Sequence, residues 1–215
     1  MKVVRTPLRW RALFEGAVRE SLVSTASAAR FGAEGTRAWE RPFHYVADDG
    51  TGNLAVLEFS VEGATCAFNG KLFVPAQRLE EMLALASPER RDSLRSVCAL
   101  PLLSGTPPGV TTVWWSDGSD ICVPIDWEDS LEHGAEVLWL EVMAAEPWLP
   151  EAARMWDLPE DVLSLAIALS RRARLGFPLL TLSREEVRLL IPTGSSHESE
   201  ASELLLSEGA FEVVE

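Results

Sequence analysis

Residues 54–74 read LAVLEFSVEGATCAFNGKLFV, and this stretch decides the fold. Apolar and β-branched residues fill 54–61 and 64–68, which predicts two strands. Asn69-Gly70 follows the second of them. Because Asn-Gly accepts the positive φ angles of a type I′ turn, it predicts a hairpin between 64–68 and 71–74. The stretch therefore indicates an antiparallel sheet built from hairpins.

Two more hairpins extend this sheet in the prediction. Residues 43–47 face 54–61 across a turn rich in Asp and Gly, so that 43–74 forms a β-meander. Residues 110–115 and 121–125 flank a second Asp- and Gly-containing turn and predict the last hairpin. Trp114 and Trp115 are adjacent in this hairpin, so their side chains are expected on opposite faces.

Helices are predicted where apolar residues recur every three or four positions. The predicted helices span about 8–29, 75–86 and 159–175, and a Ser183–Glu186 capping box opens a shorter one. Ser87 and Pro88 supply an N-cap and a first-turn proline for one more helix.

The remaining segments carry weaker patterns. Alternation over 136–142 predicts a strand, 195–202 is expected to be loosely ordered, and 211–214 predicts an edge strand. No domain-scale linker interrupts the chain, so we predict one α+β domain over 1–215, an antiparallel sheet flanked by helices. Its parts are an N-terminal amphipathic helix (1–31), the β-meander (43–74), an acidic Trp-rich block (106–170) and an acidic tail (193–215).

Composition narrows the functional classes. The chain has 215 residues, a net charge of −14 and three widely spaced cysteines without a CxxC pair. Unpaired cysteines favour a reducing compartment, so a cytoplasmic location is expected. The negative total disfavours direct nucleic-acid binding, which begins with phosphate neutralisation. No stretch approaches the roughly 20 apolar residues of a membrane span, so no membrane partner is expected.

Charge is unevenly distributed along the chain. Between Thr106 and Ser170 there are thirteen acidic residues and one base, Arg154, and this block holds six of the eight tryptophans. Residues 1–46 carry a net charge of +4, and a second basic patch follows Ser170. The block can form a recognition surface, be neutralised internally by these basic segments, or only keep the protein soluble.

Catalytic and metal sites receive little support. Carboxylates crowd residues 117–132, yet the EF-hand spacing is absent, and no Cys or His pair has zinc spacing. Nucleotide-binding and nucleophile-elbow motifs are missing as well. Cys66 within ATCAF is typical of a small core residue. We therefore predict no cofactor, no metal and no catalytic residue.

A protein-binding function is the preferred prediction. Clustered carboxylates attract a basic partner and speed its encounter, and tryptophan provides binding energy at interfaces. We expect an immunity-type, inhibitory or adaptor protein that captures a basic partner such as a nuclease toxin or another nucleic-acid-binding protein. Its oligomeric state is left open. The predicted binding residues surround the second hairpin: Trp115, Asp117, Asp120, Asp126, Trp127, Glu128, Asp129 and Glu132.

The alternative is a carboxylate-based hydrolase or a glycan-binding protein, with or without a divalent cation. Carboxylates beside tryptophans are also typical of sugar clefts, and glycoside hydrolysis needs two carboxylates facing one bond. Thirteen candidates do not single out such a pair. Convergence of three or more carboxylates in a concave pocket would favour the enzyme.

Overall fold

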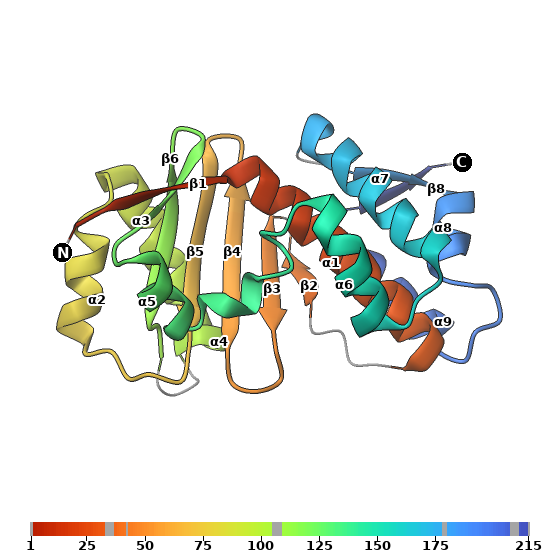
Figure 1. The fold of residues 1–215 in the computed structure, drawn as a ribbon, viewed down its shortest axis with the longest axis horizontal. Helices are drawn as coiled ribbons and strands as arrows, with labels where there is room; N and C mark the ends of the chain where they lie inside the picture. Colours follow the sequence, from red (N-terminus) through yellow and green to blue (C-terminus); the bar gives the residue numbers. More distant parts are fainter. Residues whose placement is uncertain are drawn as a thin grey trace. The chain divides into compact units, whose positions relative to one another are not determined.

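The computed structural model describes residues 2–32, 37–41, 43–104, 109–177, 180–206 and 211–214. The predicted α+β class is confirmed, because a seven-stranded antiparallel sheet is combined with helices (Figure 1). The strand order is β1 (Val4–Arg9), β7 (Asp120–Val123), β6 (Thr112–Asp117), β5 (Gly63–Asn69), β4 (Leu54–Ser60), β3 (His44–Asp48) and β2 (Arg37–Arg41). The chain divides into two compact units, Met1–Arg11 with Val46–Trp139 (unit 1) and Ala12–Tyr45 with Leu140–Glu215 (unit 2). Each unit is described by itself.

The central hairpin of unit 1 differs from the predicted one. Strands β4 (Leu54–Ser60) and β5 (Gly63–Asn69) pair antiparallel along their whole length, from Leu54↔Asn69 to Ser60↔Gly63. The turn lies at Val61 and Glu62, and Gly63 takes the positive φ angle that follows it. The hairpin predicted at Asn69-Gly70 is wrong, because 71–74 forms no strand.

Gly70 has a packing role instead of a turn role. A Cβ atom placed on it would lie 2.6 Å from the carbonyl carbon and oxygen of His133. The glycine therefore lets the chain after β5 pass close to the backbone at His133. Sequence reading misassigned it because close backbone approach and positive φ both select glycine.

The hairpin of β6 (Thr112–Asp117) and β7 (Asp120–Val123) confirms the prediction for this region. Its neighbour β1 (Val4–Arg9) was missed. β1 pairs with β7 at the edge of the sheet, and its register shifts between Arg5 and Arg9. Pro7 lies within this irregular part, as expected of a residue that cannot donate a ladder hydrogen bond. The predicted helix from Leu8 therefore begins two residues later.

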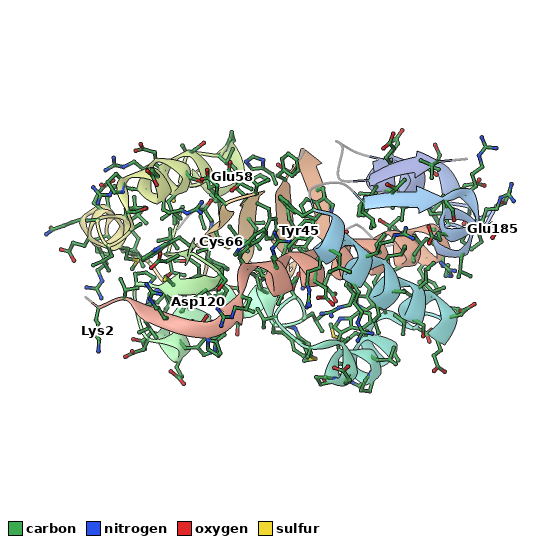
Figure 2. The ribbon with its side chains drawn as sticks, turned by 90° about the horizontal axis from the view of Figure 1, so that it is seen from above. Lys2, Tyr45, Glu58, Cys66, Asp120 and Glu185 are labelled. Atoms are coloured by element: carbon green, nitrogen blue, oxygen red, sulfur yellow. The ribbon has the colours of Figure 1, made fainter. Side chains whose placement is uncertain are left out.

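Helices cover both faces of the unit 1 sheet (Figure 2). α2 (Ala76–Leu83) and α3 (Pro88–Cys98) confirm the predicted helices, with Ser87 as the N-cap that accepts from the Arg90 amide. Thr65 hydrogen-bonds Ser93 of α3, whereas Trp114, on the other face, donates to Ser130 of α5 (Trp127–Glu132). α4 (Pro101–Ser104) is short. The strand predicted at 136–142 is wrong, because η1 (Ala135–Leu138) is a 3₁₀ turn that Gly134 introduces with φ 102°.

Unit 2 is built around α1 (Trp10–Phe31), which confirms the predicted amphipathic helix with shifted ends. Phe14, Val18 and Leu22 are buried, as their spacing predicted. The strands β2 (Arg37–Arg41) and β3 (His44–Asp48) close the order of the large sheet, and the division between the units falls within β3. α6 (Ala145–Trp156) and α7 (Glu160–Gly176) follow, and α7 confirms the helix predicted at 159–175.

The C-terminal part of unit 2 is more ordered than its sequence indicated. The capping box of Ser183 and Glu186 is confirmed at the start of α8 (Arg184–Leu190). The loose segment predicted at 195–202 is wrong, because α9 (Glu198–Leu206) begins within it. β9 (Phe211–Val214) pairs parallel with β8 (Leu180–Ser183) in a separate two-stranded sheet.

Candidate functional site

The β6–β7 hairpin carries two of the predicted binding carboxylates, and both have basic partners. Asp117 forms an ion pair with Arg5 and Asp120 forms one with Arg9, both bases coming from β1. Arg9 also donates to Ser119. The internal neutralisation that the charge pattern left open therefore occurs at this hairpin. Exposed pairs of this kind contribute only about 0–1 kcal/mol to stability.

Trp115 does not provide an exposed aromatic anchor. Its side chain is 3% exposed, and it lies opposite Cys122 of β7. Trp114 points to the other face, as alternation in a strand requires, and its indole Nε1 donates to Ser130 Oγ at 2.7 Å. Both adjacent tryptophans therefore belong to the interior of unit 1.

α5 carries the predicted residues that remain available at the surface. Trp127 is half-buried and stacks on Trp114, with 5.2 Å between the ring centroids. The four neighbouring carboxylates are exposed: Asp126, Glu128, Asp129 and Glu132. Within the described part of the chain, none of these four forms an ion pair or a side-chain hydrogen bond. We call these four residues with Trp127 the α5 acidic surface.

Some carboxylates of α5 stabilise the helix, but one of them does not. Glu128 and Asp129 lie in its first turn, where negative charge suits the helix dipole. Glu132 lies in the last turn, where the dipole disfavours it, and four residues after Glu128, where like charges repel. Fold stability therefore does not explain Glu132.

Two residues next to the α5 acidic surface were not among the predicted ones. Glu136 in η1 is exposed and accepts a hydrogen bond from Asn53 at 2.9 Å. Trp139 directly follows η1 and is 36% exposed, the most exposed large aromatic of unit 1 apart from Phe73 among the described residues. Glu136 and Trp139 were not predicted as surface residues, because a strand at 136–142 would have buried one of its two faces.

The described residues give no geometry for metal binding or thiol chemistry. No three His, Cys, Asp or Glu side chains gather there as a metal site would require. Burial raises the pKa of the Cys66 thiol, and burial raises that of Cys98 to about 12 with a further contribution from Glu80. A raised pKa disfavours the thiolate, which is the reactive form. The hydrolase and glycan-binding alternatives stay predictions.

Unit 2 holds a buried ionic cluster that sequence reasoning missed. Glu20, Arg19 and Trp148 form its first half. Trp148 Nε1 donates to Glu20 Oε1, and the Arg19 guanidinium lies over the Trp148 ring at 4.5 Å. Arg19 also donates to the carbonyl oxygens of Leu140 and Met143, at 2.8 and 2.9 Å. Arg19 thus joins α1 to the segment that leads into α6.

Glu141 is the centre of the second half. Tyr45 donates its hydroxyl to Glu141 Oε1 at 2.7 Å, and Arg37 Nε lies 3.4 Å from the same oxygen. Burial raises the pKa of Glu141, and the Arg37 charge opposes that shift. Glu141 is one of the thirteen acids of the block, yet it is 1% exposed and contributes nothing to an outer surface.

Glu20 makes the stability of the protein depend on pH. Burial raises its pKa to about 8, the Glu141 charge adds to the shift, and Arg19 opposes it. A free glutamate has a pKa near 4.3, so the unfolded chain releases this proton at lower pH. The stability that protonated Glu20 contributes is complete below about pH 4 and is lost as pH rises through 8.

We therefore expect Glu20→Gln, which stays neutral and keeps the acceptor for Trp148, to be more stable than the native protein at high pH. The expected gain is about 2 kcal/mol or more at pH 9, vanishing near pH 4. Urea unfolding at a series of pH values measures it. Glu203→Gln, at an exposed position of α9, serves as the control. An equal offset at every pH would contradict the expectation.

Comparison of the chain with protein-family models, with curated proteins and with solved structures found no match. Among the described helices, none is both long enough and apolar enough to cross a membrane.

Proposed function

We propose that this protein binds a basic protein partner through the α5 acidic surface, as an immunity-type or inhibitory protein does. The observation that carries the proposal is the set of four exposed carboxylates, Asp126, Glu128, Asp129 and Glu132, without basic partners in the described part of the chain. Asp117 and Asp120, by contrast, have arginine partners in β1. The binding region is therefore narrower than the eight residues that the sequence predicted.

The placement of charge supports a basic partner. The Glu132 carboxylate is repelled by the negative C-terminal end of the α5 dipole and by the Glu128 carboxylate. A cationic partner would relieve both repulsions. Clustered negative charge also speeds encounter with a positive surface and disfavours acidic competitors. A toxin nuclease or another nucleic-acid-binding protein presents such a positive surface, because it must neutralise phosphates.

The aromatic residues supply the apolar part of the interface. Trp127 is half-buried, so it is fixed by its stacking on Trp114 while part of its ring remains available. A fixed aromatic ring loses little conformational entropy on binding. Trp139, close in sequence and partly exposed, is the second aromatic candidate. Tryptophan is among the residues that most often dominate binding energy.

Charge reversal of the α5 acidic surface tests the proposal. The variant replaces Asp126, Glu128, Asp129 and Glu132 by Lys, and the bait is used to capture partners from lysate of the native host. We expect a basic protein to be retained by the native bait and lost with the variant. Retention should weaken between about 50 and 300 mM salt, because screening shortens the range of the attraction.

A matched variant controls for net charge. It replaces four exposed acids outside α5 by Lys, namely Asp92, Glu185, Glu203 and Glu212. Its total charge equals that of the test variant, so it should still capture the partner. Loss of capture with both variants would indicate a general charge effect. Retention by the α5 variant, with its circular dichroism unchanged, would refute the proposal.

A further inference from the structure

A cavity of about 700 Å³ lies in unit 1, lined by β1, by the connection between α2 and α3, by the first turn of α3, and by the β6–β7 hairpin. Small-molecule sites commonly have volumes of about 300–1,000 Å³. The cavity is distinct from the α5 acidic surface. Trp115 lines it, whereas Trp114, on the opposite face of the same strand, packs against α5.

The interior of the cavity includes apolar groups. Trp115 and Cys122 face each other across β6 and β7, and both are buried. Leu85, in the connection between α2 and α3, is half-buried and adds an aliphatic wall. Trp115 and Cys122 therefore form the buried floor of the cavity, and the apolar surface that a ligand body can contact comes mainly from the half-buried Leu85 and Val3.

The charged residues of the cavity differ in how they are paired. Arg5 is paired with Asp117, so this cation is already neutralised. Arg90 donates to the carbonyl oxygen of Glu62 at 2.5 Å, and no carboxylate pairs with it in the part of the chain that the structure describes. Gly63 lies beside this site, since a Cβ atom there would meet Ser116 Oγ at 1.7 Å and the Arg90 Nη2 atom at 3.0 Å.

Arg90 therefore retains donors that its neighbours do not use. A guanidinium carries five N–H donors in a planar fork, and that fork matches a carboxylate. Glu89 also lines the cavity and carries the opposite charge. An anion must therefore approach on the Arg90 side, with its apolar part directed toward Leu85 and Val3. In a chain of net charge −14, such a local cation favours the binding of an anion at this position.

We infer that this cavity binds a small organic carboxylate, with its carboxylate on Arg90 and its aromatic or aliphatic body against Leu85 and Val3, above the floor that Trp115 forms. The inference is independent of the proposed protein partner, because the two sites use opposite faces of the unit 1 sheet. Loss of one leaves the other intact.

The test uses three probes, indole-3-acetate, naphthalene-2-carboxylate and 4-phenylbutyrate, each compared with its neutral amide. Calorimetric and NMR titrations should show saturable binding of at least one acid, with its amide about tenfold weaker. That ratio corresponds to the loss of one charge-assisted contact. The indole N–H signal of Trp115, assigned from the Trp115→Phe spectrum, should shift on binding.

Arg90→Gln should weaken the acid about tenfold and remove its advantage over the amide. Arg95→Gln is the control, because Arg95 lies on the same helix and pairs with Glu80 at the surface. Absence of saturable binding by every probe up to about 5 mM overturns the inference, because a site with a Kd of about 1 mM would be mostly occupied at that concentration. So does an unchanged preference for acid over amide in Arg90→Gln, or an unmoved Trp115 signal.

Discussion

Replacing Gly16 by alanine is expected to lower the free energy of unfolding by about 4 kcal/mol or more. Few single substitutions destabilise a protein by this much. Gly16 lies within α1, where a Cβ atom would stand 1.8 Å from the carbonyl oxygen of Glu141. Because the obstacle is backbone, no rotamer change relieves the overlap. α1 and the segment at Glu141 would have to separate, and the buried ionic cluster would open. Chemical denaturation followed by circular dichroism measures the loss.

Gly176→Ala is the matched control for this variant. Gly176 is also helical, at the end of α7, and a Cβ atom there would meet nothing within 4 Å. Alanine is the better helix former by up to about 1 kcal/mol, so the control should be neutral or stabilising. Equal effects of the two substitutions would show that Gly16 is not a contact glycine.

Arg19→Met is expected to destabilise the protein by about 3–5 kcal/mol, the range found when one partner of a buried ion pair is removed. Methionine keeps the aliphatic length but none of the donors. The carbonyl oxygens of Leu140 and Met143 would lose their guanidinium partner. Glu20, which is 0% exposed, would lose its neighbouring positive charge. Equilibrium urea unfolding at about pH 9, above the Glu20 pKa of about 8 so that the carboxylate is ionised, gives the value.

Two comparisons separate this effect from general disruption. Combining Arg19→Met with Glu20→Gln should recover part of the loss, because the buried carboxylate is then neutral. Arg78→Met removes an exposed arginine that pairs with Glu81 three residues away, and should cost less than about 1 kcal/mol. A double variant no more stable than Arg19→Met alone would contradict the role assigned to Glu20.

The sequence predicted correctly those elements that are determined by residues close together in the chain. The α7 stripe, the Ser183–Glu186 capping box and the β6–β7 turn depend on residues within a few positions of one another, and all three are present. Gly70 and Gly63 show the limit of such signals. Gly70 lies in a predicted turn and Gly63 between two predicted strands, yet the observed turn precedes Gly63, and Gly70 is selected by His133, far along the chain.

The candidate site shows the same limit. The sequence located carboxylates around the second hairpin, but it did not predict that β1 would neutralise Asp117 and Asp120. The sequence pattern places Glu141 among the charges of the acidic block and does not single out Glu20. Their burial depends on Arg19, Arg37, Tyr45 and Trp148, which come from separate segments. Sequence order carries no information about that assembly.

The pairing of β1 with β7 also constrains the order in which unit 1 is completed. Arg9 and Asp120, the pair at the end of this ladder, are 111 residues apart in sequence. During synthesis β1 leaves the ribosome long before β7 exists, so the most N-terminal strand is among the last to be placed. Contacts this distant slow folding, because the intervening chain must first be ordered. Until then the outer edge of β7 stays open, and β1 is the strand that protects it from pairing with another molecule.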